Sequence, residues 1–170
     1  MHDWLSLLTP LTGSDAPEMY ALMQQMLSAL PSKRWYFGST QEELAAHACA
    51  GRALGIRVEG RLIALNILVP SADAHEGGYA ARLGLDEPHS LNFEDVLVAP
   101  DFRRRGIHRA MLYNSIDLAR RQGYTSIWAT VDPDNLPSMA AFTQAGFLPV
   151  TQRPTYDGRP RVFLRLPVAP

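Results

Sequence analysis

Residues 96–112 have the residue types of a phosphate-binding site. The stretch begins with an apolar run typical of a buried strand, continues through a short loop with three arginines and one glycine, residues 103–106, and ends as the start of a helix. Such a loop presents backbone N–H groups, and the following helix adds the positive end of its dipole. We therefore predict a site for a phosphate or pyrophosphate group.

The residue types in the loop fit this chemistry. Gly106 has no Cβ to block a ligand, and the amides from Arg104 to Arg109 can converge on phosphate oxygens. Arginine side chains add charge-assisted hydrogen bonds. A basic cluster alone would be interpreted as a solvated surface patch; the flanking strand, glycine and helix favour phosphate binding.

Periodicity and turn residues predict the elements that hold this loop. We expect helices from the Thr12 region to about Leu30, from Thr40 to about Cys49, and over residues 107–122 and 136–145. Strands are expected over residues 4–8, 53–58, 62–69, 91–98, 126–131, 147–151 and 161–166. Residues 71–90 are expected to form a long polar loop, which in a compact domain is often functional.

The connections between these elements predict a mixed sheet. Glu59-Gly60-Arg61 suits a tight hairpin between antiparallel strands, and a turn at Asp157 and Gly158 precedes the last strand. The strand–helix–strand unit over residues 91–131 requires a right-handed parallel crossover. Since we find no second core and no linker, we expect one α/β (α+β) domain over residues 1–170.

Composition excludes several classes of function. The chain has a hydrophobic fraction of 46% and a formal net charge of -1, which disfavours general binding to nucleic acid or membrane surfaces. No signal peptide, membrane span or metal-binding pattern is found. The lone Cys49 cannot form an internal disulfide, so we expect a cytoplasmic protein. Its small size favours a core position over a nucleophile.

Two motifs together resemble the GNAT family of acetyltransferases, which use acetyl-coenzyme A. The family's pyrophosphate loop reads Q/R-x-x-G-x-G/A, and here Arg103 and Gly106 match while His108 replaces the final glycine or alanine. The family's second motif follows at its usual spacing, in Asn135, Ser138, Phe142, Gly146 and Phe147. The resemblance is tight over residues 91–150. It implies a mixed, mostly antiparallel central sheet with helices on both faces.

The resemblance also implies which residues contact acetyl-coenzyme A. The strand before the loop would lend backbone groups to the pantetheine arm, and the loop would hold the pyrophosphate. Asn135 would act both as a helix N-cap and near the cofactor. The implied cofactor-binding residues are Leu97, Val98, Ala99, Arg103, Arg104, Arg105, Gly106, Ile107, His108, Arg109, Asn135, Ser138 and Phe142.

Acetyl transfer to an amine requires a base for the amine and a departing thiolate. Family members often have a carboxylate on the strand before the loop, where Glu94 and Asp95 stand. Adjacent strand residues face opposite sides, and we favour Glu94 as the base and Asp95 as a structural anchor. An exposed strand carboxylate or a partner for an arginine is an equally good interpretation of Glu94.

The general acid of many family members is a tyrosine at the position of Phe142, which cannot donate a proton. Tyr79 and Tyr156 are candidates by residue type only. Otherwise the thiolate leaves and takes its proton from solvent.

Of the expected sites, the acceptor site is the one that the sequence defines least. In the family the segment between the first two helices often shapes it, here residues 32–38, with Arg34, Trp35 and Tyr36 as candidates. This composition suits an acceptor with an apolar part and a carboxylate, although a packed loop explains it too.

The sequence thus predicts an N-acetyltransferase that carries acetyl groups from acetyl-coenzyme A to an amine of a small molecule or a protein, by direct attack in a ternary complex. A non-catalytic acyl-coenzyme A-binding module is the alternative, because of His108 and Phe142. Homodimers are frequent in the family, so a homodimer is also possible.

Overall fold

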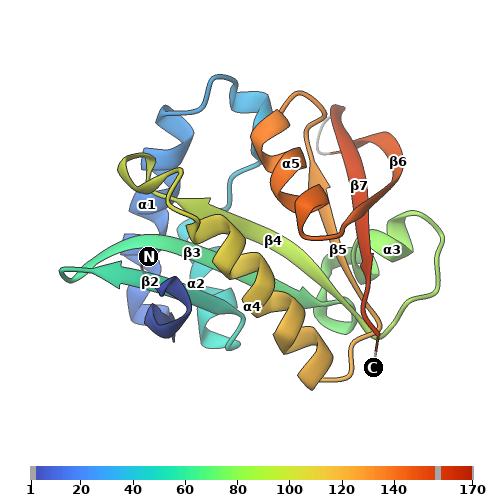
Figure 1. The fold of residues 1–170 in the computed structure, drawn as a ribbon, viewed down its shortest axis with the longest axis horizontal. Helices are drawn as coiled ribbons and strands as arrows, with labels where there is room; N and C mark the ends of the chain where they lie inside the picture. Colours follow the sequence, from blue (N-terminus) through green and yellow to red (C-terminus); the bar gives the residue numbers. More distant parts are fainter. Residues whose placement is uncertain (1–2, 156–157, 170) are drawn as a thin grey trace. The chain divides into compact units, whose positions relative to one another are not determined.

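The computed structural model describes residues 3–155 and 158–169, in which seven strands form one mixed sheet (Figure 1). The strand order is β1-β2-β3-β4-β5-β7-β6. The strands are β1 (Leu8–Pro10), β2 (Ala53–Val58), β3 (Arg61–Pro70), β4 (Ser90–Val98), β5 (Ser126–Val131), β6 (Leu148–Thr155) and β7 (Arg159–Pro167). The helices are α1 (Ala16–Ser28), α2 (Gln41–Cys49), α3 (Gly78–Arg82), α4 (Ile107–Arg121) and α5 (Leu136–Gln144). The mixed α/β fold predicted from the sequence is confirmed.

The predicted hairpin and the predicted parallel strand–helix–strand connection are both present in the sheet. β2 and β3 are antiparallel, with Val58 opposite Arg61. The two residues between them, Glu59 and Gly60, have positive φ angles of 50° and 81°, as a two-residue hairpin requires. β4 and β5 are parallel, with Leu91 opposite Ile127, and α4 connects them.

The chain forms two compact units, which are described separately. The described part of unit 1 is residues 3–67 and 95–111, and that of unit 2 is residues 68–94, 112–155 and 158–169. In unit 1, α1 and α2 pack together. The Thr40 hydroxyl accepts from the Glu43 N–H while the Glu43 carboxylate accepts from the Thr40 N–H, which fixes the start of α2 where the sequence predicts it.

Unit 2 has two aromatic clusters. Phe142 of α5 packs edge-to-face on Phe93 and Phe147, with ring centroids 5.6 and 5.0 Å away. Tyr79 of α3 packs with Trp128 and Phe163. Since side chains alternate along strands, α3 and α5 cover opposite faces of this part of the sheet.

Several local expectations were wrong. Residues 4–7 form a short 3-10 helix instead of a strand, because the Asp3 carboxylate caps it by accepting from the Leu5 N–H. Residues 71–90 contain α3 and two short 3-10 helices, since the buried Asn92 amide accepts from the Tyr79 N–H at 2.8 Å. Cys49 is exposed at the last position of α2, and so is not a core residue. Asp157 and Tyr156 lie outside the described residues.

Candidate active site

The basic loop lies between β4 and α4, in unit 1. A short 3-10 helix, Pro100–Phe102, follows β4, and α4 begins at Ile107. Arg104 and Gly106 both have left-handed backbone, with φ of 62° and 81°. A Cβ added to Gly106 would meet no atom within 4 Å. Glycine is therefore favoured here by the backbone conformation, and the space beside it is open to a ligand.

Trp4 fixes the backbone of this loop. Its indole Nε1–H donates to the carbonyl oxygen of Arg105 at 2.8 Å, and the Trp4 ring is buried. This bond holds the Arg105–Gly106 peptide in one orientation at the start of α4. Sequence reasoning missed the contact because the two residues are far apart in the chain and Trp4 stands in an ordinary apolar run.

The four arginines of residues 103–109 divide into one fixed and three open side chains. Arg105 donates to the carbonyl oxygen of Asp101 at 3.1 Å, and its guanidinium lies 4.8 Å from the centre of the Phe102 ring. Asp101 also accepts two hydrogen bonds from Arg61, at 2.7 and 3.0 Å, which lower the pKa of its carboxyl group. Arg103, Arg104 and Arg109 make no side-chain hydrogen bond or ion pair within the described part of the chain.

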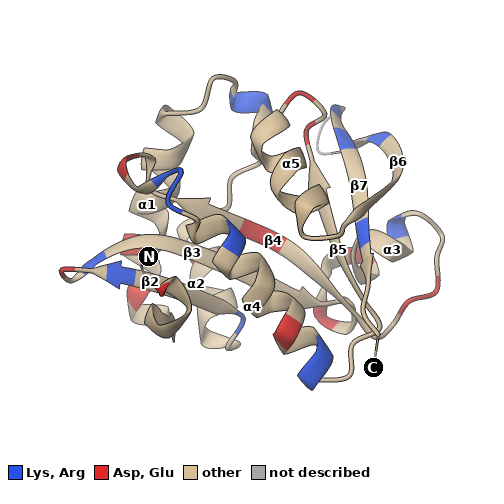
Figure 2. Ribbon diagram, viewed as in Figure 1, with Lys and Arg blue, Asp and Glu red and all other residues tan. Residues whose placement is uncertain are grey.

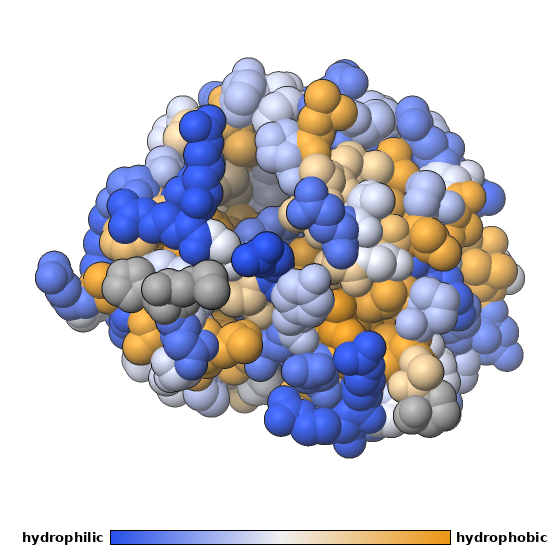
Figure 3. Space-filling view, in the orientation of Figure 1, coloured by the Kyte–Doolittle hydropathy of each residue, from blue (hydrophilic) through white to orange (hydrophobic). Residues whose placement is uncertain are grey.

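These open arginines give the loop a strongly positive surface. Figure 2 shows the segment between β4 and α4 in the colour of basic residues, and Figure 3 shows hydrophilic side chains gathered over the same segment. Positive guanidinium groups beside a fifteen-residue helix's N-terminus are the chemistry that binds phosphate groups.

His108, the second residue of α4, contributes no charge at neutral pH. Burial lowers the pKa of its imidazole to about 4. Its replacement of the family's small residue therefore adds a neutral ring. Ile107 beside it is buried in the core.

The end of β4 offers fewer free backbone groups than the sequence suggests. The Ala99 N–H donates to the carbonyl oxygen of Ile63 at 2.8 Å, and the Ala99 carbonyl accepts from the Phe102 N–H at 2.9 Å. Leu97 is buried and Val98 half-buried. Leu97 and Val98 remain the candidates for backbone contacts to a pantetheine arm.

The second motif lies in unit 2. Asn135 caps α5 as predicted, because its side-chain oxygen accepts from the Ser138 N–H at 3.3 Å. Ser138 is half-buried, and Phe142 is buried among aromatic rings. Tyr79 is a core residue whose hydroxyl donates to the Phe93 carbonyl at 3.2 Å.

The two neighbouring carboxylates of β4 differ in environment. Glu94 is exposed, whereas Asp95 is buried and accepts a hydrogen bond from the Tyr36 hydroxyl. Asp95 thus anchors the segment between α1 and α2, in agreement with the structural role expected for it. In that segment Arg34 is exposed and Trp35 half-buried, within a short 3-10 helix capped by Ser32.

The mixed sheet and the strand–basic loop–helix unit are typical of proteins that bind a cofactor through its phosphate groups. Comparison with known proteins specifies the family. A family model described as "Acetyltransferase (GNAT) family" matches residues 2–147. The chain belongs to that family. It is an N-acetyltransferase whose acetyl donor is acetyl-coenzyme A.

The chain is also similar in sequence and in structure to individual acetyltransferases. The chain is 27% identical to the [ribosomal protein bS18]-alanine N-acetyltransferase of Escherichia coli K12, over 97% of this chain and 99% of that protein. It is 34% identical to the streptothricin acetyltransferase of Streptomyces lavendulae, over 45% of this chain and 40% of that protein. The crystal structure of the Escherichia coli S18-alanine enzyme has the same fold, with a TM-score of 0.71, 22% identity, and coverage of 95% of this chain and 93% of that one.

None of the helices in the described residues is long and apolar enough to cross a membrane.

Proposed function

We propose that the acceptor of this N-acetyltransferase is the amino-terminal amine of a protein, and that transfer occurs by direct attack in a ternary complex. The basic loop supports the donor half of the proposal: open arginines, a left-handed Gly106 and a helix N-terminus stand together within residues 103–109. End-to-end similarity to ribosomal-protein alanine N-acetyltransferases supports a protein acceptor. A small amine is the second candidate, supported by the shorter match to a streptothricin acetyltransferase.

In this proposal the pyrophosphate binds the backbone and side chains of residues 103–109. Arg103, Arg104 and Arg109 supply the charge, whereas Arg105 shapes the loop through its bond to Asp101. Leu97 and Val98 contact the pantetheine arm through their backbone. The motif residues of α5, which are Asn135, Ser138 and Phe142, complete the assigned cofactor contacts.

The reaction needs one base and one proton for the leaving sulfur. The amine nitrogen attacks the thioester carbonyl, a C–N bond forms and the C–S bond breaks. The nitrogen loses its proton to Glu94, directly or through water, and the coenzyme A thiolate takes a proton from solvent because Phe142 has none to give. The exposed position of Glu94 on β4 leaves its carboxylate accessible for this role.

Replacement of Glu94 tests the catalytic assignment. We expect Glu94→Gln to lower kcat by about 100-fold or more, the usual contribution of a general base, with the dissociation constant for acetyl-coenzyme A unchanged. Release of free coenzyme A measures the rate. Glu42→Gln, at an exposed position in the first turn of α2, is the matched control. An unchanged rate in Glu94→Gln would remove Glu94 as the base.

The acceptor is tested with one peptide in two forms, with a free and with a blocked amino terminus. A peptide that begins with alanine should be acetylated, the same peptide with a blocked terminus should not, and its lysine side chains should remain unmodified. Streptothricin tests the small-amine candidate. Acetyl-coenzyme A binding without turnover of any amine would favour the alternative of a non-catalytic acyl-coenzyme A-binding module.

We also propose an acceptor-binding role for Arg34, Trp35 and Tyr36. Tyr36 is tied to Asp95, so the segment that carries the cation and the aromatic rings has a fixed attachment to β4. Arg34→Gln should raise the KM for an acidic peptide and leave the KM for acetyl-coenzyme A unchanged.

For the whole chain we propose a single functional domain over residues 1–170, a cytoplasmic location and a homodimer. The lone cysteine supports a reducing compartment. The edge strand β6 supports self-association, because it exposes Leu148 and Val150. Light scattering of the protein and of a Leu148→Lys variant tests the dimer.

A further inference from the structure

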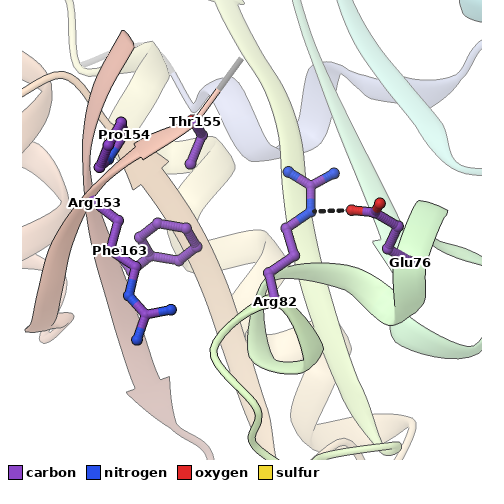
Figure 4. A pocket seen from close by; sticks show the side chains of 6 residues that line it. All are labelled: Glu76, Arg82, Arg153, Pro154, Thr155 and Phe163. Carbon is purple, nitrogen blue, oxygen red and sulfur yellow. Dashed lines mark ion pairs between the residues drawn. The ribbon is translucent and has the colours of Figure 1, made fainter. Parts of the chain in front are cut away.

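Unit 2 contains a pocket whose lining includes none of the residues assigned above to acetyl transfer. Its cavity volume is about 400 Å³, and it is lined by Glu76, Arg82, Arg153, Pro154, Thr155 and Phe163. Figure 4 shows that Arg82 and Glu76 come from the α3 side, whereas the other residues come from β6 and β7. A cavity of this size is in the usual range for small-molecule sites.

The charged groups of the pocket carry a net charge of +1. Arg82 and Arg153 supply two positive charges and Glu76 one negative charge. The Nε of Arg82 lies 3.5 Å from the Glu76 carboxylate, a long contact, and the Glu76 side chain is 64% exposed. Arg153 has no acidic partner in the described part of the chain. One guanidinium is therefore left for a ligand with a single negative charge.

A second polar group also lacks a partner. The Oγ1 of Thr155 is buried and makes no hydrogen bond within the described residues. A buried hydroxyl without a partner is unfavourable, and a ligand oxygen would accept its proton. Thr155 stands two positions after Arg153 on β6, so both side chains lie on the same side of that strand.

The remaining walls are apolar. Phe163 and Pro154 line the pocket, and Phe163 packs against Tyr79 at a ring-centroid distance of 6.1 Å. The Arg82 guanidinium lies 5.8 Å from the centre of the Tyr79 ring. An apolar or aromatic body would contact these walls while its charged end reaches Arg153.

We propose that this pocket binds a small monocarboxylate with an aromatic or apolar body. The carboxylate pairs with Arg153 and accepts from the Thr155 hydroxyl, with Arg82 as the second cation. A phosphate group with two negative charges suits the site less, because the pocket has only one unbalanced positive charge and Glu76 would repel it.

Calorimetric titration of the intact protein with phenylacetate tests the proposal without any acetyl-coenzyme A, so that its result is separate from that of the acetyl-transfer experiments. Phenylacetate should bind at least tenfold more tightly than phenylacetamide, its neutral analogue, and more tightly than phenyl phosphate. Equal binding of phenylacetate and phenylacetamide, no binding of phenylacetate, or tighter binding of phenyl phosphate would overturn it.

Three variants assign the binding to these residues. Arg153→Gln should weaken phenylacetate binding at least tenfold, and the isosteric Thr155→Val severalfold. Glu76→Gln should strengthen it, because the negative charge beside Arg82 is removed. Arg121→Gln, at the exposed end of α4 in the same unit, is the matched control for loss of one arginine. If Arg153→Gln binds phenylacetate as Arg121→Gln does, the assignment is wrong.

Discussion

At the scale of single residues, Gly106 is the glycine of the proposed cofactor loop and should tolerate a β-branched residue poorly. Its φ of 81° is strained for any β-branched residue, although a Cβ there would meet no neighbouring atom. In Gly106→Val we therefore expect the loop to leave its conformation and the dissociation constant for acetyl-coenzyme A to rise at least tenfold, as measured by calorimetric titration.

Gly123 offers a matched control for this substitution. It follows α4, has a φ of 76°, and its added Cβ also meets nothing within 4 Å. Both valine variants should lose a similar amount of stability, about 1–3 kcal/mol for one strained residue. Only Gly106→Val should lose affinity. Normal affinity in Gly106→Val would contradict the assignment of the loop.

His108 should make the stability of the fold depend on pH. Burial lowers its pKa from 6.5 to about 4, so the unfolded chain binds the proton more readily than the folded one. The neutral His108 imidazole therefore contributes to the free energy of unfolding fully above pH 6.5. This stabilisation is lost as the pH falls toward 4, by up to about 1.4 kcal/mol per pH unit.

Denaturant unfolding between pH 7 and pH 5 measures this effect. The carboxyl groups whose pKa is lowered, such as those of Asp15 and Glu87, titrate below this window. Burial also lowers the pKa of His47. Part of the slope of the free energy of unfolding against pH should therefore persist in His108→Asn, and it should disappear in the double variant that also has His47→Asn. An unchanged slope in His108→Asn would show that the ring of His108 is not responsible.

At the scale of elements, the N-terminal 3-10 helix contacts the proposed cofactor loop through Trp4. Trp4→Phe keeps an aromatic ring in the core and removes the hydrogen bond to the Arg105 carbonyl. One hydrogen bond contributes about 0.5–1.5 kcal/mol, so the affinity for acetyl-coenzyme A should fall by about 2- to 10-fold in a calorimetric titration.

Trp128→Phe is the control for Trp4→Phe. The Trp128 indole donates to the Glu87 carboxylate at 2.8 Å in unit 2, so its loss removes an indole hydrogen bond, here to a charged acceptor. It should lower stability and leave the affinity for acetyl-coenzyme A unchanged. Equal affinities in all three proteins would mean that Trp4 does not position the loop.

Elements with local signals were predictable from the sequence. The capping box at Thr40 and Glu43 fixes α2, and the two-residue turn at Gly60 fixes the β2–β3 hairpin, because each depends on residues a few positions apart. α3 was not predictable from local signals, since a contact with the buried Asn92, thirteen positions from Tyr79, helps to hold it. The 3-10 helix at Trp4 was missed although its cap at Asp3 is local, because residues 4–8 also have the apolar pattern of a strand. The Tyr36–Asp95 bond joins residues 59 positions apart and left no pattern in the sequence.

At the scale of the whole molecule, each boundary between the two compact units lies within a strand or a helix and not in a loop. The boundaries fall within β3, β4 and α4. Neither unit is a continuous piece of chain, so we expect them to unfold together in one transition. Equal calorimetric and van't Hoff enthalpies would show this, and two resolved transitions would contradict a single domain.

The most direct test of the central claim is thermal unfolding with acetyl-coenzyme A, with free adenosine as the control. At about one hundred times its dissociation constant the cofactor should stabilise the folded protein by about 2.7 kcal/mol, a rise in Tm of about 5–10 °C for a chain of this size. We predict this rise with acetyl-coenzyme A, little change with adenosine, and a rise of at most about half this size in Gly106→Val, whose dissociation constant should be at least tenfold higher. An unchanged Tm at saturating acetyl-coenzyme A would contradict the assignment of the basic loop as the cofactor site.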